Sequence, residues 1–201
     1  MAARHRLQGG RGRQALAHEA ARILAEHAAP SYLQAKRKAA ERLRFSPDGP
    51  LPSDEEVEAA LAEHQRLFQP AQAGDLRHHR AVALEAMRFF RAYRPRLVGS
   101  VLSGTADAYS TVHLHLFAPT PEEVLIRLVE HDIPFEEDSH RLTTSDGGEQ
   151  DYPAFRFVVE DVPVEVVVFA EDGLRSPVVL RDGSPVRRAS VKQVARLVEG
   201  G

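Results

Sequence analysis

The stretch RLVGSVLSGTADAYSTVHLHLF, residues 96–117, decides how this sequence folds. It contains two short runs rich in β-forming residues, 96–102 and 111–117, which predict two strands joined by a loop. Gly99 and Ser100 follow the apolar start of the first run. A glycine lets the backbone approach a ligand closely, and free backbone N–H groups and a serine hydroxyl donate hydrogen bonds to phosphate oxygens. The stretch therefore predicts a strand–turn–strand unit suited to a triphosphate.

This unit resembles the nucleotidyltransferase superfamily, in particular the minimal and kanamycin-type nucleotidyltransferases. In that superfamily Gly-Ser ends the first strand, and a Ser-Asp-x-Asp/Glu sequence supplies two carboxylates that hold magnesium. A third carboxylate comes from a later strand. Here Gly99-Ser100, the loop length and Tyr109-Ser110 match the pattern. The resemblance covers about residues 76–169 and implies an α+β fold, a nucleotidyltransferase-like mixed β-sheet backed by helices.

The two metal-binding positions differ from the superfamily. The best register places Thr111 and His113 where the carboxylates belong, and a shift by two residues places His113 and His115 there. Magnesium requires hard oxygen ligands, and neutral imidazole is a poor substitute. Glu165 is the candidate third carboxylate, so the resemblance implies Glu165, His113 and Thr111 as catalytic candidates at degenerate positions. We expect inefficient nucleotidyl transfer and a weak dependence on magnesium.

The same resemblance assigns the nucleotide phosphates of ATP or another triphosphate to Gly99, Ser100 and Ser110. The residues around them also suggest a different site. Strand alternation places His113 and His115 on one face, where Glu165 of a neighbouring strand would converge with them. Two imidazoles and a carboxylate suit zinc, iron or nickel.

The alternative to a metal site is that both histidines lie on a sheet face without a ligand. We expect this alternative, because residues 112–117 are well explained as an ordinary alternating strand. The chain also offers no obvious fourth ligand, and no carboxylate is apparent that would orient the imidazoles.

The N-terminal half predicts helices. Apolar residues recur at helical spacing from Gln14 to Tyr93, with breaks at Pro30 and at the SPDGPLP segment. Helix starts are predicted at Ser31 and Ser53, each followed three residues later by a capping partner. We predict a flexible basic tail over 1–13, a helical segment over 14–74 and a nucleotidyltransferase-like α+β domain over 75–201.

Three side-chain groups in this half carry secondary predictions. An apolar stripe is expected to pack within the chain or across a homodimer, and two polar runs are expected at the surface. The stripe comprises Val57, Ala60, Leu61, Leu67 and Phe68, and the runs are Lys36-Arg37-Lys38 and His78-His79.

Composition excludes several classes of protein. The chain has no cysteine, which excludes disulfides, zinc ribbons and iron–sulfur clusters. The net charge of −3 gives no general attraction to nucleic acid or to an anionic membrane. No apolar stretch approaches the roughly 20 residues that cross a bilayer. We therefore expect a cytoplasmic protein without a nucleic-acid or membrane partner.

Three functions from different classes remain open. The first is a nucleotidyltransferase-fold protein that acts as a nucleotide-binding or regulatory module after losing efficient transfer. The second is an active nucleotidyltransferase with altered metal ligands. The third is a scaffold in which the helical segment binds a protein partner. Nucleotide binding without turnover separates the first from the second, and an absence of binding favours the third.

Overall fold

The computed structural model describes residues 2–26, 28–29, 31–45, 50–68, 70–145, 147–174, 178–180 and 183–200. The side chains of residues 2–10, 67–68 and 70–73 lie outside this description. The chain forms two compact units, Met1–Ala73 and Gly74–Gly201, called here the N-terminal and C-terminal units. None of the described helices is long and apolar enough to cross a membrane.

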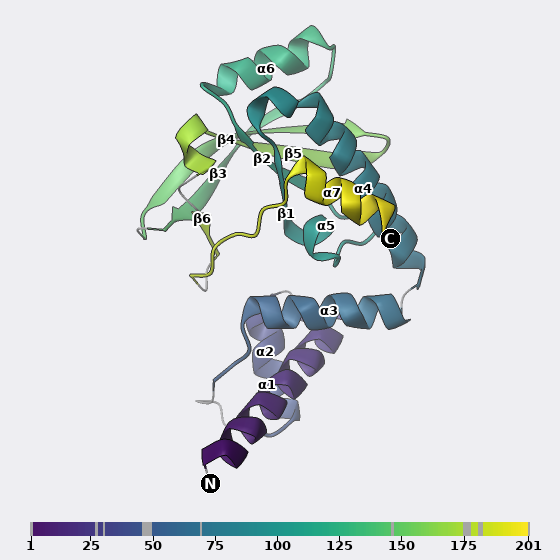
Figure 1. The fold of residues 1–201 in the computed structure, drawn as a ribbon, viewed down its shortest axis with the longest axis vertical. Coiled ribbons are helices and arrows are strands. Elements are labelled where there is room, and N and C mark those ends of the chain that lie inside the picture. Colours follow the sequence, from purple (N-terminus) through teal and green to yellow (C-terminus); the bar gives the residue numbers. More distant parts are fainter. Residues whose placement is uncertain are drawn as a thin grey trace. The chain divides into compact units, whose positions relative to one another are not determined.

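The N-terminal unit contains the helices α1 (Ala2–Ala25), α2 (Tyr32–Arg42) and α3 (Asp54–Phe68) (Figure 1). Small side chains dominate the contact between them, which lets the helix backbones approach closely. The buried set includes Ala17, Ala20, Ala21, Ala35 and Ala39, with Leu16, Ile23, Val57 and Leu61 filling the remaining space. Two predicted helix starts are confirmed. The Ser31 hydroxyl accepts from the backbone N–H of Gln34, and Ser53 forms a reciprocal pair with Glu56.

Two features of this unit differ from the sequence prediction. Helix α1 begins at Ala2 and so includes the segment predicted as a flexible tail. Glycine lowers helix propensity but keeps its backbone N–H, and Gly12 lies so close to the Phe45 ring that a Cβ there would be 2.9 Å from it. Lys36 is buried and not solvated, because its ammonium donates to the Pro52 carbonyl and pairs with Asp54.

The predicted apolar stripe on α3 is buried where its side chains are described. Val57, Ala60 and Leu61 belong to the core of the N-terminal unit. The side chains of Leu67 and Phe68 lie outside the described residues. The stripe therefore packs within this chain over its first half.

The C-terminal unit contains a six-stranded mixed sheet. Its strands are β1 (Arg96–Val98), β2 (Val112–Phe117), β3 (Glu136–Thr144), β4 (Glu149–Val159), β5 (Val162–Phe169) and β6 (Val178–Val179). Their spatial order is β1-β2-β5-β4-β3-β6, and the pair β2 and β5 is parallel while the other pairs are antiparallel. The helices are α4 (Pro70–Phe89), α5 (Gly99–Ser103), α6 (Pro121–Glu130) and α7 (Val191–Glu199), with short 3-10 turns η1 (Arg91–Tyr93) and η2 (Glu171–Leu174).

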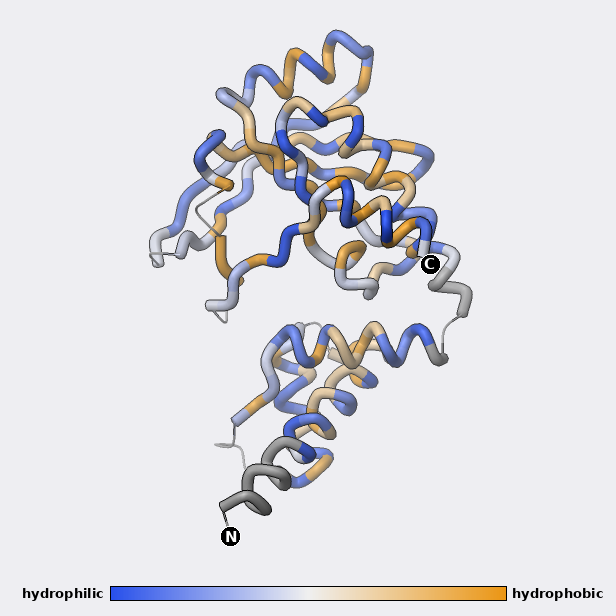
Figure 2. The backbone as a smooth tube through the Cα atoms, viewed as in Figure 1, coloured by the Kyte–Doolittle hydropathy of each residue, from blue (hydrophilic) through white to orange (hydrophobic). Residues whose placement is uncertain are grey.

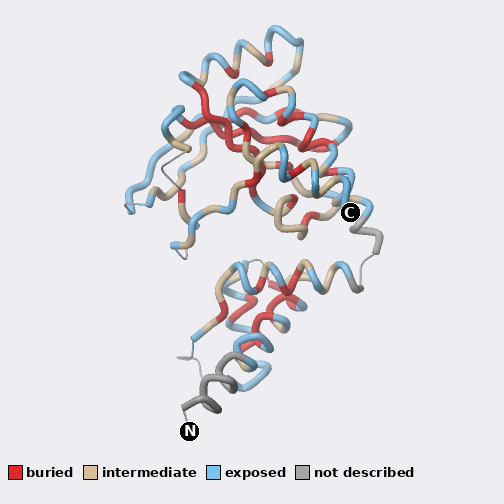
Figure 3. The backbone as a smooth tube through the Cα atoms, in the orientation of Figure 1, coloured by how far each residue is buried: buried red, intermediate tan, exposed pale blue. Residues whose placement is uncertain are grey.

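The two faces of the sheet differ in composition. One face packs against the α-helices and holds the main core, which includes Met87 of α4, Phe90 just after it, Leu114 of β2, Val166 of β5 and Val194 of α7. Figure 2 shows apolar residues gathered in the central strands, and Figure 3 shows the same strands buried. The opposite face, called here the polar face, carries the alternate side chains of the same strands.

The predicted α+β class is confirmed, with differences in individual elements. The predicted strand over 96–102 ends at Val98, because Gly99 adopts a φ of +74° and helix α5 begins there. Strand β3 has no counterpart in the prediction, since its sequence EEDSHRLTT is polar. His79, predicted at the surface, is buried on α4, where its Nδ1 donates to the Asp75 carbonyl at 2.7 Å.

Candidate functional site

The polar face places two sequence-predicted residues, His113 and Glu165, in register. On neighbouring strands His113 lies opposite Glu165, and on the other side it lies opposite Val98, the residue before Gly99. Strand β4 adds Arg156, which lies opposite Glu165. Partners in a β-ladder share a face, so these side chains meet on the polar face.

Glu165 is the centre of this cluster. It is only 2% exposed, and each carboxylate oxygen accepts hydrogen bonds. Oε1 lies 3.0 Å from Nδ1 of His113, while Oε2 lies 2.6 Å from Nε of Arg156 and 3.0 Å from Nε2 of His140. Arg156 also contacts the carboxylate of Asp138, with its Nη2 3.0 Å from Oδ2. A buried carboxylate is therefore held by donors from three strands.

These contacts set the protonation states of the cluster. The hydrogen bond from His113, aided by that from Arg156, lowers the pKa of Glu165 to about 2, although burial acts in the opposite direction. The carboxylate is ionised and accepts only, so Nδ1 of His113 must carry the proton that it donates. In the neutral imidazole, Nε2 of His113 is then a free base. The His113 side chain is 41% exposed, which leaves it accessible to a ligand.

Gly99-Ser100 adjoins this cluster. Gly99 is exposed, and a Cβ placed on it would lie 3.5 Å from Cδ2 of His113. A ligand that approached the Gly99 backbone would therefore meet the His113 ring. Ser110, also predicted for phosphate binding, uses its hydroxyl within the loop, donating to Oδ1 of Asp107 at 2.8 Å. Thr111 is half-buried and directly precedes β2.

His115 is separated from the Glu165 cluster. It lies two residues from His113 along β2, about 7 Å away, and faces Val167 of β5. Its Nδ1 accepts a hydrogen bond from Nε of Arg188 at 3.2 Å, and its ring packs 4.6 Å from that of Phe169. Burial, and then the neighbouring charge of Arg188, lower the pKa of His115 to about 3, so this imidazole is neutral.

The residues predicted as transition-metal ligands do not come together as one group. Within the described residues, the group of three possible ligands whose atoms lie within 4.8 Å of one another is Asp138, His140 and Glu165. Both of its carboxylates already contact Arg156. A guanidinium thus supplies positive charge where a cation would bind, and a metal would have to displace it. The donor set does not fit magnesium.

Sequence reasoning missed Arg156, His140 and Asp138. The last two belong to β3, whose polar sequence gives no strand signal, and Arg156 has no motif of its own. Alternation on β4 was the available signal, since it places Arg156 on the face opposite the buried Phe155 and Phe157.

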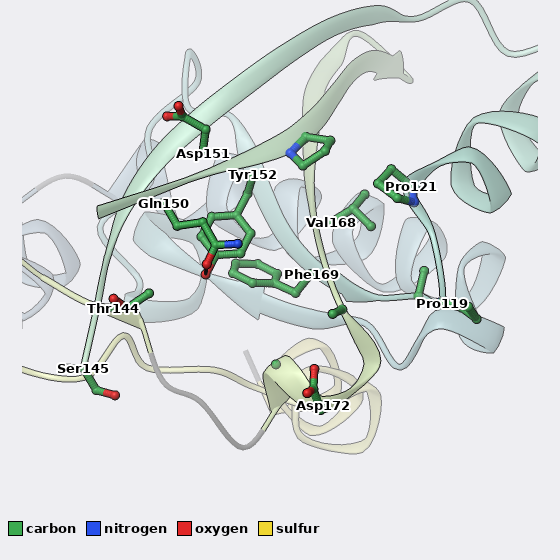
Figure 4. Close-up of a pocket in the computed structure, with 14 residues that line it drawn as sticks. Pro119, Pro121, Thr144, Ser145, Gln150, Asp151, Tyr152, Val168, Phe169 and Asp172 are labelled. Carbon is green, nitrogen blue, oxygen red and sulfur yellow. Dashed lines mark hydrogen bonds between the residues drawn. The ribbon is translucent and has the colours of Figure 1, made fainter. Parts of the chain in front are cut away.

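A pocket of about 550 Å³ lies beyond the other end of β2 and β5. The rings of Tyr152 and Phe169 line it side by side, with centroids 4.5 Å apart (Figure 4). Gln150 and Asp172 add polar groups to its wall. The polar face thus runs from Gly99 and His113, past His115, to an aromatic pocket.

Comparison with known proteins identifies no family for this chain. No family model, no curated protein and no solved structure matches the chain.

Proposed function

We propose that this chain is a nucleotidyltransferase-like protein that binds a nucleotide as a regulatory module and no longer catalyses efficient magnesium-dependent transfer. The observation that carries the proposal is the set of contacts made by the Glu165 carboxylate. The carboxylate at the expected third metal-binding position accepts hydrogen bonds from Arg156 and His113, and Nε2 of His140 lies 3.0 Å from it. Magnesium needs carboxylate oxygens free to coordinate it, and a guanidinium already occupies this one.

The strand arrangement supports the likeness to nucleotidyltransferases. The resemblance implies that Gly-Ser ends one strand, that the next strand carries the metal positions, and that a later strand faces it with a third carboxylate. Strands β1, β2 and β5 are neighbours, and His113 lies opposite Glu165. This arrangement agrees with the positions that the resemblance implies. At two of these positions Thr111 and His113 stand in place of carboxylates.

The exposed backbone at Gly99 supports nucleotide binding. Its φ of +74° is readily adopted by glycine, and a side chain there would occupy space beside His113. Anionic phosphates that approach this backbone would meet no free carboxylate, because Glu165 is neutralised by its partners. Phosphate binding without a bridging magnesium ion is therefore chemically consistent here.

Calorimetric titration with ATP, in magnesium and in EDTA, tests the proposal. We expect binding with similar affinity in both buffers and no nucleotidyl transfer or ATP hydrolysis above background. Gly99→Val should abolish binding. The matched control is Gly147→Val, which also replaces a glycine of positive φ but has open space around its Cβ. Binding that requires magnesium, or that survives in Gly99→Val, would contradict the proposal.

A second candidate function is metal-independent acid–base catalysis by His113. Its specific support is the contact with Glu165, which fixes the protonated Nδ1 and leaves Nε2 as a base on an exposed side chain. Turnover of ATP in EDTA that disappears in His113→Gln would favour this candidate. Binding of ATP by the unsubstituted chain without turnover would favour the regulatory module.

A further inference from the structure

Arg188 has an unsatisfied hydrogen-bond donor on the polar face. Its Nη2 is buried and, within the described residues, has no hydrogen-bond partner. Its Nε donates to His115, and Nη1 makes a long contact of 3.5 Å with the Gly173 carbonyl. A buried donor without a partner is costly, since it has lost water and gained nothing in exchange. An acceptor from a ligand would remove this cost.

The surroundings hold the Arg188 guanidinium in one place. Its carbon lies 5.1 Å from the centroid of the Phe117 ring and 5.4 Å from that of Phe169. The following residue, Ala189, is hydrogen-bonded to Leu97 of β1 in both directions. Arg188 therefore lies across the polar face with its backbone anchored to the sheet edge and its guanidinium against two rings. Such preorganisation reduces the ordering cost of binding.

Arg96 brings a second positive charge to the same place. It lies opposite His115 in the β1–β2 ladder and so points to the polar face. Among the described residues, its hydrogen bonds go to the backbone carbonyls of Arg94 and Pro95. Burial, and then the charge of Arg96, lower the pKa of Arg188, which indicates two cations that repel each other.

Neither arginine has a counter-ion among the described residues. In the C-terminal unit the described arginine–carboxylate pairs are those of Arg94, Arg141 and Arg156. The imidazole beside Arg188 is that of His115, which is neutral and acts only as an acceptor toward it. Two cations without a carboxylate, one of them with a free buried donor, make a site complementary to an anion.

We infer that Arg96 and Arg188 bind the phosphate chain of the nucleotide, beside His115 on the polar face. This inference rests on the proposed function and specifies where the phosphates lie. Arg96 is two residues before Val98 on β1, so the arginine site begins about 7 Å from Val98, the residue that precedes Gly99. A triphosphate that starts at the Gly99 backbone would extend along β2 toward Arg188. The ligand class is therefore a nucleoside polyphosphate, with recognition centred on its phosphates.

Calorimetric titration of the full chain with inorganic tripolyphosphate, ATP and adenosine tests the inference. We expect the unsubstituted protein to bind tripolyphosphate and ATP but not adenosine. Arg188→Met keeps the apolar stem of the side chain, and we expect it to weaken the binding of tripolyphosphate and of ATP at least about tenfold. The matched control is Arg141→Met, which removes the same charge from an exposed arginine that is paired with Asp151.

Circular dichroism and a thermal melt show whether each variant is folded. If Arg188→Met does not fold, Arg96→Met carries the test, because this substitution leaves the ring contacts of Arg188 in place. Equal polyphosphate affinity in a folded Arg188→Met or Arg96→Met and in Arg141→Met would overturn the inference. ATP binding that needs Gly99 but not Arg188 would do the same while leaving the proposed function intact. Tripolyphosphate binding that needs Arg188, without binding of ATP, would support the anion site and reject the nucleotide.

Discussion

The buried imidazole of His115 should make the C-terminal unit sensitive to acid. Its pKa is about 3 in the folded chain, mainly because of burial, against an ordinary value of 6.5. Below pH 6.5 the unfolded chain therefore binds a proton that the folded chain rejects. Stability is fully present above pH 6.5 and is lost as the pH falls toward 3.

The magnitude follows from the pKa difference. The shift from 6.5 to about 3 corresponds to roughly 5 kcal/mol once the pH is below 3. Between pH 7 and pH 5 the expected loss is about 2 kcal/mol. Glu165 also destabilises the folded chain in acid, but only at lower pH. Its stabilising contribution is fully present above its ordinary pKa of 4.5 and is lost as the pH falls toward 2. The interval from pH 7 to 5 thus isolates His115.

The measurement is urea unfolding followed by circular dichroism at pH 7, 6 and 5 on the unsubstituted protein and on His115→Gln. A glutamine can still accept from Arg188 but does not titrate. We expect the unsubstituted protein to lose about 2 kcal/mol more than His115→Gln over this interval. His78→Gln, which replaces an exposed histidine of α4, should behave like the unsubstituted protein. Parallel pH profiles for the protein and His115→Gln would refute the reasoning.

Two further predictions concern the N-terminal unit. Ile23 is fully buried in its core, so Ile23→Ala should reduce the free energy of unfolding by roughly 2–5 kcal/mol in urea titrations, and a change near zero would mean that the helices do not pack as described. Asp54→Ala should cost roughly 1–3 kcal/mol because it leaves the buried Lys36 ammonium without its ionic partner. The double variant with Lys36→Met should recover stability, and a double variant no more stable than Asp54→Ala would show that the unpaired Lys36 ammonium is not the cause of the loss.

Local sequence patterns determined much of the secondary structure. The helix starts at Ser31 and Ser53 follow from a side chain that caps a backbone N–H group only three residues away. The alternation in 112–117 likewise determines which side chains share a face, because successive Cβ atoms point in opposite directions. Both are short-range effects, so a single sequence is sufficient to predict them. The α+β class follows from such patterns.

Short-range patterns failed for polar residues that the sequence places at the surface or outside strands but that the fold buries or pairs. Lys36 and His79 belong to polar runs that are typical of a surface, yet both are buried. The Pro52 carbonyl and the Asp54 carboxylate bind the Lys36 ammonium, and the Asp75 carbonyl, one turn earlier, accepts from Nδ1 of His79. Strand β3 is also polar, and it is a strand because its backbone hydrogen-bonds to β4. For Lys36 and β3, the energy that decides the outcome comes from partners that the local pattern does not contain.

In the candidate site, too, some features follow from the sequence and others only from the tertiary structure. The sequence alone determined that Gly99 has the conformational freedom to be approached closely and that His113 and His115 share a face. Only the tertiary structure decided that Arg156 from β4 and His140 from β3 reach the Glu165 carboxylate, and that Arg188 crosses to His115. Charges interact over a few ångströms, and these residues lie far apart along the chain. Sheet pairing brings them together and surrounds the Glu165 carboxylate with an arginine and two histidines.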